Sequence, residues 1–368
     1  THKTRLFLVT QGGQKVLNEE HLGSPQQSLL WGLGNVAASE HREWETICLD
    51  LDITSKAEQC AANLVVSTLS KDIQSTNQEN RLAWRSNSEY CARLNVYEAP
   101  NKKATVAIAK PNMTYLISGA QGAIGLELGS WLIQQGAKHL ALVGRSSADN
   151  EFLETLRSQG AQPHFYQADV ADISVLTEVF ELIEQNQAPI GGVFHLAGIL
   201  DDGLLVSQKW SRWQEVLAPK VNGAWNLHQL TKTKNLAVFV NFSSLASLLA
   251  PVGQGSYAAA NSFLDALAQY RRSNGLVGLS VNWGPWADVG MSAQLAQEHH
   301  TRMESLGIGQ ITSDHAFDRL AKLISDENFA NQGQVGVVAM DWQRYCETDS
   351  CSFLNNFLPK DRTIHTVC

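Results

Sequence analysis

The sequence has 368 residues, of which 44% are hydrophobic and 17% charged, and this composition provides enough apolar material for one large or two smaller domains. Its net charge of −8 argues against a nucleic-acid-binding protein, and no apolar run approaches the roughly 18 residues of a membrane span. The six cysteines form no CxxC pair and no zinc-type cluster, so we expect reduced thiols, no metal site and a cytoplasmic protein without a secretory signal. The chain begins at Thr1 without an initiator Met, and we therefore expect a fragment of a longer protein.

The first hundred residues contain a short series of strand-like and helix-like runs. Strands are predicted at residues 5–9, 46–51 and 92–97, and a helix is predicted at residues 26–38. Pro, Asn and Lys then gather in residues 99–103 and 110–112, a composition typical of a linker, so we place a boundary near residue 110. Gly32 and Gly34 are interpreted as packing glycines, because no strand leads directly into them.

The second part of the chain alternates strands and helices more regularly. Strand-like runs lie at residues 114–118, 139–143, 164–167, 192–195, 237–242 and 279–283, with a late strand at 335–340. Each gap among the first six has room for a helix. This alternation predicts an α/β fold with a doubly wound parallel sheet, and the apolar strands are typical of strands buried on both faces.

The strongest local signal is a glycine-rich turn at residues 119–125 (GAQGAIG), which follows an apolar strand and precedes a helix that is predicted to end at Gly136. Glycines let a backbone approach a pyrophosphate, and the first turn of the helix offers free N–H groups to its charge. The turn therefore predicts a dinucleotide site; the alternative is a glycine-rich turn that binds no ligand. The cofactor-binding residues predicted here are Gly119, Gln121, Gly122, Ile124 and Gly125.

The residues after the next two strands indicate which dinucleotide is bound. Gly144, Arg145 and Ser146 lie about twenty residues beyond the turn, where an NAD enzyme usually carries an acid for the ribose hydroxyl. A cation and a hydroxyl suit a 2′-phosphate instead, so NADPH is predicted; the alternative is an exposed loop arginine. Asp169 and Val170, after the third strand, are candidates for contact with the adenine, although Asp169 also suits an ordinary turn.

A second group of residues suggests the chemistry. Ser244 ends a predicted strand and Tyr257 follows 13 residues later. Reduction of a ketone needs a hydride at carbon and a proton at oxygen, and a Tyr hydroxyl can donate that proton if a nearby ammonium lowers its pKa. Ser244 is then expected to hold the carbonyl oxygen, with Lys220 as the candidate cation. Lys220 falls on an apolar helical stripe, where a lysine usually extends to solvent, and Pro219 either breaks this helix or starts it.

The tyrosine belongs to a longer pattern, Tyr257-x-x-x-Asn261, with Lys220 upstream. Further motifs are residues 194–198 (FHLAG), 218–223 (APKVNG) and 282–286 (NWGPW). This set resembles the short-chain dehydrogenase/reductase superfamily, whose usual pattern is Tyr-x-x-x-Lys. It resembles more closely the ketoreductase domains of modular polyketide synthases, in which the Lys and Asn exchange positions.

The resemblance implies a domain organisation and site roles. It implies two Rossmann-like subdomains: residues 1–110 are structural and degenerate, without cofactor, and residues 111–345 are catalytic and bind NADPH. A substrate lid is implied at about 286–308 and a C-terminal tail at 346–368. The catalytic residues implied are Tyr257, Ser244, Lys220 and Asn261. The cofactor-binding set gains Ala197, Gly198 and Pro285, together with Tyr257 and Lys220.

The family also has a stereochemical signature. Leu200, Asp201 and Asp202 match the Leu-Asp-Asp motif of B-type ketoreductases, and Gln254 stands where A-type domains carry a Trp. The resemblance therefore implies a B-type domain and a D-configured β-hydroxyl. From the residues alone, the two aspartates would be interpreted as a solvated acidic loop. The substrate-facing residues implied are these four with Trp286 and Met291.

The function implied is NADPH-dependent reduction of a β-ketoacyl thioester on the phosphopantetheine arm of an acyl carrier protein. Other polyketide synthase domains are expected partners, whereas nucleic acid and membranes are not. Three alternatives stay open: a redox-inactive scaffold or epimerase domain, an NADPH-sensing module, and a free-standing alcohol dehydrogenase. The intact catalytic residues argue against the first, and the additional N-terminal segment and missing initiator Met argue against the last.

Overall fold

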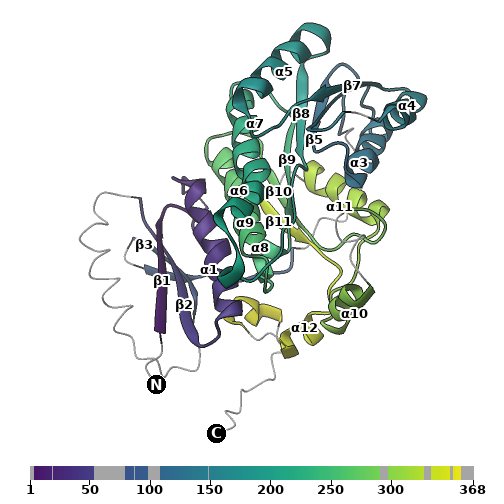
Figure 1. Ribbon diagram of the computed structural model, residues 1–368. Helices are drawn as coiled ribbons and strands as arrows, with labels where there is room; N and C mark the ends of the chain where they lie inside the picture. Colours follow the sequence, from purple (N-terminus) through teal and green to yellow (C-terminus); the bar gives the residue numbers. More distant parts are fainter. Residues whose placement is uncertain are drawn as a thin grey trace.

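Two β-sheets organise the part of the chain that the computed structural model describes, which is residues 4–18, 20–53, 79–86, 88–97, 108–147, 149–290, 297–326, 333–348 and 351–357. A four-stranded sheet comes from the first hundred residues and a seven-stranded sheet from the rest. Figure 1 shows the smaller sheet in purple and blue at the lower left and the larger sheet toward the upper right. The predicted α/β fold class is confirmed.

The smaller sheet has three parallel strands and one antiparallel strand, in the order β1-β2-β3-β4. Its strands are β1 (Thr4–Gln11), β2 (Trp44–Leu51), β3 (Arg81–Arg85) and β4 (Ser88–Cys91). A short 3-10 helix (Pro25–Gln27) and helix α1 (Ser28–Glu40) connect β1 to β2. The strands predicted at 5–9 and 46–51 and the helix predicted at 26–38 are therefore confirmed.

The prediction of a strand at residues 92–97 is wrong, because this segment leaves the sheet after β4. The backbone N–H of Ala92 still donates to the carbonyl oxygen of Arg81, but that of Leu94 donates to the carbonyl oxygen of Phe353 at 2.9 Å. Ala92 and Leu94 pack in an apolar cluster with Phe353 near the end of the described chain. Ala92 and Leu94 are thus partly buried against C-terminal residues rather than within a sheet, whereas Val96 is exposed.

All neighbouring strands of the larger sheet are parallel, in the order β11-β10-β9-β8-β5-β6-β7. They are β5 (Thr114–Ser118), β6 (His139–Gly144), β7 (Gln162–Gln167), β8 (Ile190–His195), β9 (Val238–Ser244), β10 (Leu279–Trp283) and β11 (Gln334–Val337). The connecting helices include α3 (Ala123–Gln134), α4 (Asn150–Ser158), α5 (Ile173–Asn186), α7 (Ala224–Thr231), α9 (Gly255–Ser273) and α11 (Ser313–Ser325). The predicted strands are confirmed, with the last one shorter than expected.

The strand order reverses between β5 and β8. From β5 the chain adds β6 and β7 on one side, and it then returns to add β8, β9, β10 and β11 on the other. In parallel sheets of this kind, ligands bind beyond the carboxyl ends of the strands at the point of reversal. The glycine turn after β5 and the loop after β8 therefore lie where a site is expected.

Separate apolar layers cover the two faces of the larger sheet. Within β5, Tyr115 and Ile117 belong to one layer and Leu116 to the other. Side chains of α3 and α11 complete the first layer, and side chains of α5 and α7 complete the second. Burial on both faces explains why these strands are continuous apolar runs in the sequence.

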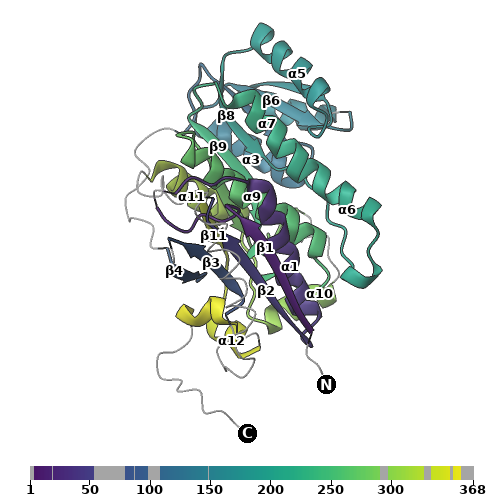
Figure 2. The ribbon, with the colours of Figure 1, turned by 90° about the vertical axis from the view of Figure 1, so that its left-hand side faces the viewer.

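Helix α1 of the smaller sheet packs against helix α9 of the larger one, as both ribbon views show (Figures 1 and 2). A Cβ on Gly32 would lie 2.5 Å from the carbonyl oxygen of Ala258, so the close approach of the two helices needs glycine there. A Cβ on Gly34 would lie 2.4 Å from Cδ1 of Leu8. The interpretation of Gly32 and Gly34 as packing glycines is confirmed, and their helix joins the smaller sheet to the side of the larger one.

Candidate active site

A cavity of about 860 Å³ lies at the carboxyl ends of the strands where the strand order reverses. The predicted site residues that line it are Gly119, Gln121, Gly122, Ile124, Gly125, Gly144, Arg145, Ser146, Asp169, Val170, Ala197, Gly198, Leu200, Asp202, Lys220, Ser244, Gln254, Tyr257, Pro285 and Trp286. Asn261 and Asp201 do not line it, and Met291 lies outside the described residues. The fold thus brings most of the predicted residues to one cavity.

The three positions of the turn after β5 are glycine for different structural reasons. Gly119 has a φ of +71°, and a Cβ there would lie 2.7 Å from the backbone of Ala197. A Cβ on Gly125 would lie 2.2 Å from the carbonyl oxygen of Ala120. Gly122, at the N-terminus of α3, has a φ of −69°, and the nearest atom to a Cβ there would be 3.5 Å away. The fold requires Gly119 and Gly125, whereas Gly122 leaves the backbone open beside the cavity.

Two glutamines hold the loop after β6, while its arginine stays exposed. Gln121 Nε2 donates to the carbonyl oxygen of Ser147, and Gln167 Nε2 donates to the carbonyl oxygen of Arg145 at 3.0 Å. The side chains of Arg145 and Ser146 are exposed at the edge of the cavity. A fixed loop with an exposed guanidinium can recognise a phosphate group.

The turn after β7 is partly self-stabilised. Asp169 Oδ1 accepts a hydrogen bond from the backbone N–H of Ala171 at 2.9 Å, and Asn226 Nδ2 donates to the carbonyl oxygen of Val170 at 3.0 Å. Val170 is buried, yet both candidate residues line the cavity. Asp169 therefore stabilises the turn, which was the alternative to a contact with the adenine, and it also lines the cavity.

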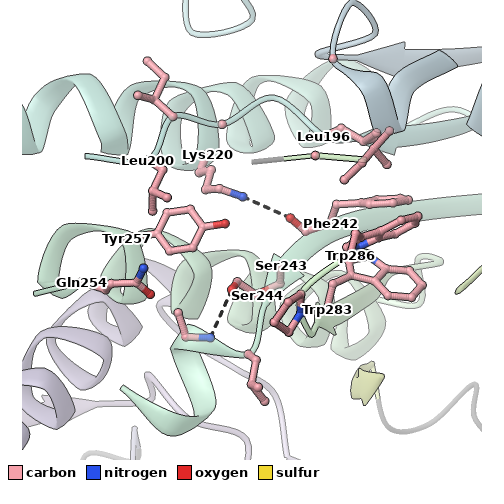
Figure 3. Close-up of a pocket in the computed structure, with 18 of the residues that line it drawn as sticks. Leu196, Leu200, Lys220, Phe242, Ser243, Ser244, Gln254, Tyr257, Trp283 and Trp286 are labelled. Atoms are coloured by element: carbon pink, nitrogen blue, oxygen red, sulfur yellow. Dashed lines mark hydrogen bonds between the residues drawn. The ribbon is translucent and has the colours of Figure 1, made fainter. Parts of the chain in front are cut away.

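Lys220 lies in a π-helical turn, Ala218–Gly223, between α6 (Trp210–Leu217) and α7. Pro219 neither breaks the helix nor starts it, because the chain passes through a π turn, a form frequent at functional sites. Lys220 is 3% exposed, and its Nζ donates to the carbonyl oxygen of Phe242 at 3.1 Å (Figure 3). The alternative in which this lysine extends to solvent is therefore excluded.

Burial also changes the protonation of Lys220. It lowers the pKa of the ammonium to about 8, although the buried carboxyl of Asp265 opposes this shift. The Nζ atom lies 5.4 Å from the centre of the Tyr257 ring. A Cβ on Gly198 would lie 2.7 Å from Cε of Lys220, so Gly198 makes the room that the lysine side chain needs.

Tyr257, Ser244 and Lys220 lie close together in the cavity, as Figure 3 shows. Tyr257 comes from the first turn of α9, and Ser244 is the last residue of β9. Ser244 Oγ accepts a hydrogen bond from the backbone N–H of Ala246 at 3.2 Å. Three separate elements therefore present a phenol, a hydroxyl and an amine to the same space.

The prediction that the pKa of Tyr257 is lowered is wrong for this structure. Burial raises the pKa of Tyr257, and hydrogen bonds with Ser244 and Asn261 offset only part of that rise. In this structure the ammonium of Lys220 donates to a backbone carbonyl. The phenol therefore keeps its proton at neutral pH.

Asn261 lies one helical turn after Tyr257 and behind it. Its side chain is buried, and Nδ2 donates to the carbonyl oxygen of Tyr257 at 2.8 Å. The hydroxyl of Ser243 donates to the carbonyl oxygen of Asn261 at 3.3 Å. The structure thus places Asn261 as a support of the tyrosine rather than in the cavity.

A buried polar network beneath Ser244 was missing from the sequence prediction. The carboxylate of Asp265 accepts hydrogen bonds from Ser247 at 2.7 Å, Ser280 at 2.6 Å and Asn282 at 2.8 Å. Ser247 Oγ also lies 3.0 Å from the carbonyl oxygen of Ser244. Burial raises the pKa of Asp265, and these hydrogen bonds oppose the rise. A carboxylate one turn beyond Asn261, between the apolar residues at 263–264 and 266–268, was the signal that could have found it.

His195 is a second buried group without a predicted role. Its Nδ1 lies 2.6 Å from Ser118 Oγ, so it joins the ends of β8 and β5. Burial lowers the pKa of His195 to about 3, and the charge of Lys220 acts in the same direction. The imidazole is therefore neutral and structural. It lies within the motif at residues 194–198, from which the sequence assigned only the alanine and glycine.

The three residues of the Leu-Asp-Asp motif point in different directions. Leu200 packs in the apolar cluster that contains Tyr257. Asp201 forms an ion pair with Arg212, in which Nε lies 2.6 Å from Oδ2, and this pairing lowers the pKa of Asp201. Asp202 Oδ2 accepts a hydrogen bond from Gln254 Nε2 at 3.0 Å. Asp202 is exposed and Asp201 is partly buried, so the loop is acidic and solvated, and both carboxylates also bond to other side chains.

One wall of the cavity is aromatic. Trp286 is 4% exposed, and its ring centre lies 5.2 Å from that of Trp283 and 5.6 Å from that of Phe317. Trp286 is thus largely part of the core. Within the predicted lid, helix α10 (Gln297–Ser305) follows, and its Arg302 and Met303 also line the cavity.

Two further features, a metal site and a membrane span, are not found in the described residues. No group of three or more His, Cys, Asp or Glu side chains among them could hold a metal ion. Within those same ranges, no helix is both long enough and apolar enough to cross a membrane.

Comparisons with known proteins show which family this chain resembles. A family model described as the KR domain matches residues 113–288. A phenolphthiocerol/phthiocerol polyketide synthase protein of Mycobacterium tuberculosis is 31% identical over 96% of this chain and 19% of its own length. Polyketide synthase GfsB of Streptomyces halstedii is 35% identical over 84% of this chain and 5% of its own length. The chain thus spans about a fifth or less of these two curated relatives.

Solved structures match over nearly the whole chain. An A-type ketoreductase structure from a modular polyketide synthase has a TM-score of 0.85 and 30% identity, covering 96% of this chain and 74% of that one. A C2-type ketoreductase has a TM-score of 0.82 and 27% identity, covering 97% and 75%. The first ketoreductase of the tylosin polyketide synthase has a TM-score of 0.78 and 31% identity, covering 96% and 74%. With this fold, this site and these relatives, the chain belongs to the ketoreductase domains of modular polyketide synthases, a family of oxidoreductases.

Proposed function

We propose that this domain reduces the β-keto group of an acyl thioester, with NADPH as the hydride donor. One arrangement carries the proposal: Tyr257, Ser244 and Lys220 lie together in a cavity that the open turn at Gly122 also lines. A cofactor held at the turn and a ketone held at the tyrosine would share one cavity, which replaces a bimolecular encounter by a fixed geometry. The bound cofactor would supply the hydride.

The residues at the turn fit a dinucleotide. Gly122 leaves the backbone open at the N-terminus of α3, where free N–H groups and the helix dipole favour a pyrophosphate. The exposed guanidinium of Arg145, with Ser146 beside it, suits the 2′-phosphate that distinguishes NADPH from NADH. The remaining residues proposed to hold the cofactor are Gly119, Gln121, Ile124, Gly125, Gly144, Asp169, Val170, Ala197, Gly198 and Pro285.

Tyr257 is proposed as the proton donor. Burial raises its pKa, so the phenol is protonated at neutral pH and can donate to the carbonyl oxygen as negative charge develops there. The hydroxyl of Ser244 would donate a hydrogen bond to the same oxygen. Lys220, buried beside the tyrosine ring, would stabilise the phenolate left after proton transfer. Asn261 is proposed to support the tyrosine from behind.

We also propose a carrier-bound substrate and a D-configured product. Support for the B-type assignment comes from Leu200 beside the tyrosine and from the hydrogen bond that joins Asp202 to Gln254. Gln254 stands where A-type domains carry a Trp, and Trp286 and Met291 are proposed as further substrate-facing residues. The related structures include A-type and C2-type domains, so the subtype rests on these residues alone.

The same proposal extends to the organisation of the chain. Residues 1–110 would support a catalytic part at 111–345, with a lid at about 286–308 and a tail at 346–368. The partners would be an acyl carrier protein and other domains of a cytoplasmic polyketide synthase. The described part of the tail, through Phe353, packs against Ala92 and Leu94 of the N-terminal part.

A reduction assay tests this function. The domain is incubated with NADPH and a β-ketoacyl thioester on an acyl carrier protein, and the product is examined by chiral chromatography. We expect one NADPH oxidised for each product formed and a predominance of the D-β-hydroxyacyl thioester. No NADPH oxidation with carrier-bound or short thioesters would contradict the reductase and favour a redox-inactive scaffold. An L-configured product would contradict only the B-type assignment.

A further inference from the structure

Glu40, the last residue of helix α1, connects the smaller sheet to the mouth of the cavity. Its Oε2 accepts a hydrogen bond from the backbone N–H of Leu205 at 2.8 Å, and its Oε1 accepts one from the backbone N–H of Gly253 at 3.0 Å. Leu205 and Gly253 belong to loops that are far from Glu40 and from each other in the sequence. Hydrogen bonds to an ionised carboxylate are stronger than those between neutral groups, so Glu40 holds both loops at a fixed separation.

The two loops that Glu40 joins also contact each other. The backbone N–H of Gly203 donates to the carbonyl oxygen of Gly253 at 2.8 Å, and Gly203 pairs with Gln254 in a parallel bridge. Gln254 in turn donates its side-chain N–H to Asp202 at 3.0 Å. Gly253 therefore uses its N–H for Glu40 and its carbonyl for the loop after β8. The end of α1 and the two loops form one connected unit.

This unit borders the proposed position of the substrate. Leu200, Asp202 and Gln254 line the cavity together with Tyr257, and Leu200 belongs to the apolar cluster that contains the tyrosine. Among the described residues, Glu40 has these two N–H groups and no ion pair as its partners. A change at Glu40 would therefore shift the loops over the reacting carbonyl without touching the catalytic side chains.

We propose that Glu40 is a positioning residue for stereoselection: the carboxylate at the end of α1 clamps the two loops that decide which face of the keto group meets the hydride. This inference rests on the reductase function proposed above. It gives the smaller sheet a part in selectivity as well as in support. A tenfold change in selectivity corresponds to a small difference in transition-state free energy, so a loosened loop is sufficient to produce it.

The experiment compares Glu40→Ala and Glu40→Gln with Glu43→Ala. Glu43 is a matched control on the same segment, because its side chain is 66% exposed and lies beside His41. With a short β-ketoacyl thioester, we expect the fraction of the minor stereoisomer to rise about tenfold in Glu40→Ala and less in Glu40→Gln, which keeps one acceptor oxygen. Affinity for NADPH should not change in any variant, and Glu43→Ala should keep the wild-type isomer ratio.

Hydrogen exchange supplies a readout that does not depend on catalysis. The amides of Leu205 and Gly253 should exchange about tenfold faster in Glu40→Ala, while the amides of residues 119–125 keep their wild-type rates. An unchanged isomer ratio in folded Glu40→Ala would overturn the inference, even with faster exchange, because Glu40 would then be only a structural contact. Unchanged exchange would overturn the clamp itself. A wild-type domain that reduces no ketone contradicts the proposed function instead, and the exchange rates still decide whether Glu40 holds the loops.

Discussion

The turn after β1 and the turn after β5 begin alike and end differently. In each, the chain leaves a parallel strand through a glycine with a positive φ, +62° at Gly12 and +71° at Gly119. After β1, the backbone N–H groups of Gly13 and Gln14 donate to the carboxylate of Asp50 at 2.8 Å and 3.2 Å. After β5, the corresponding backbone borders the large cavity. In the smaller sheet, the N–H groups of the turn are bound by the carboxylate of Asp50. In the larger sheet, the turn borders a cavity and is available to a ligand.

The neighbouring strands explain this difference. Two residues before the left-handed glycine, Thr10 pairs with Asp50 across β1 and β2, whereas Ile117 pairs with Leu142 across β5 and β6. Asp50 is fully buried, accepts a hydrogen bond from the hydroxyl of Thr10 at 2.6 Å and pairs with Arg85 at 2.6 Å. A glycine turn alone therefore does not identify a dinucleotide site. The residue beside it on the next strand decides whether the turn is closed.

The largest expected effect lies at the open cavity. Tyr257→Phe removes the proposed proton donor and keeps the ring, so turnover should fall by about 10²–10⁴-fold while NADPH binding persists. Initial rates of NADPH oxidation measure this loss. Tyr270→Phe is the matched control, because Tyr270 lies on the same helix but packs against Trp225 and His228 away from the cavity. Near-normal turnover of Tyr257→Phe would mean that another group supplies the proton.

The closed turn should matter for stability rather than for turnover. Asp50→Ala leaves the guanidinium of Arg85 buried without this carboxylate, and breaking such a pair typically costs about 3–5 kcal/mol. Glu20 also bonds to Arg85 and can recover part of that loss. Denaturant titration measures the effect, and the folded fraction should keep its reductase rate. Wild-type stability in Asp50→Ala would show that the internal anion contributes nothing.

The buried amine at the open site gives the stability a dependence on pH. The pKa of Lys220 is lowered from 10.5 to about 8, so between these values the unfolded chain binds more protons than the folded one, and stability rises with pH. Below about pH 8 both states are protonated and the full cost of burying the charge is present. The difference in unfolding free energy between wild type and Lys220→Met should therefore move in favour of the wild type as pH rises through this window. A difference that is constant with pH would contradict the lowered pKa.

The smallest expected effect concerns the choice of cofactor. Arg145→Ala removes the cation proposed for the 2′-phosphate, so the preference for NADPH over NADH should narrow by about tenfold. Dissociation constants for both cofactors measure it. Arg157→Ala is a suitable control, because Arg157 is exposed on α4 and pairs with Glu154. Equal affinities of the wild type for NADPH and NADH would remove the basis of the assignment.

Most strands could be predicted from the sequence because they are apolar on both faces and alternate with helices. The segment at 92–97 could not, since its Ala92 and Leu94 pack with Phe353, more than 250 residues away in the chain. A local pattern records that a residue is buried but not what covers it. The two strands β3 and β4 escaped prediction for the opposite reason: β3 carries Arg85 inward, and β4 is exposed along its length.

The candidate site residues at the strand ends could also be predicted from the sequence, because the glycine turn and the tyrosine pattern each lie in one short stretch of the chain. Three features were not: the π turn that buries Lys220, the raised pKa of Tyr257, and the carboxylate network of Asp265. Each depends on contacts between elements distant in the chain. The closing of the first turn by Asp50 belongs to the same class, because it needs the pairing of β1 with β2.

The contrast between the two turns is tested most directly by the dissociation constant of NADPH in Gly122→Ala. The backbone there has a φ of −69° and the nearest atom to the new Cβ is 3.5 Å away, so the melting temperature should not change. A methyl group on the backbone that approaches the pyrophosphate should weaken NADPH binding by about tenfold or more. Gly13→Ala, the matched change in the turn closed by Asp50, should leave NADPH affinity at the wild-type value. Wild-type affinity in Gly122→Ala, or a loss confined to Gly13→Ala, would contradict the account.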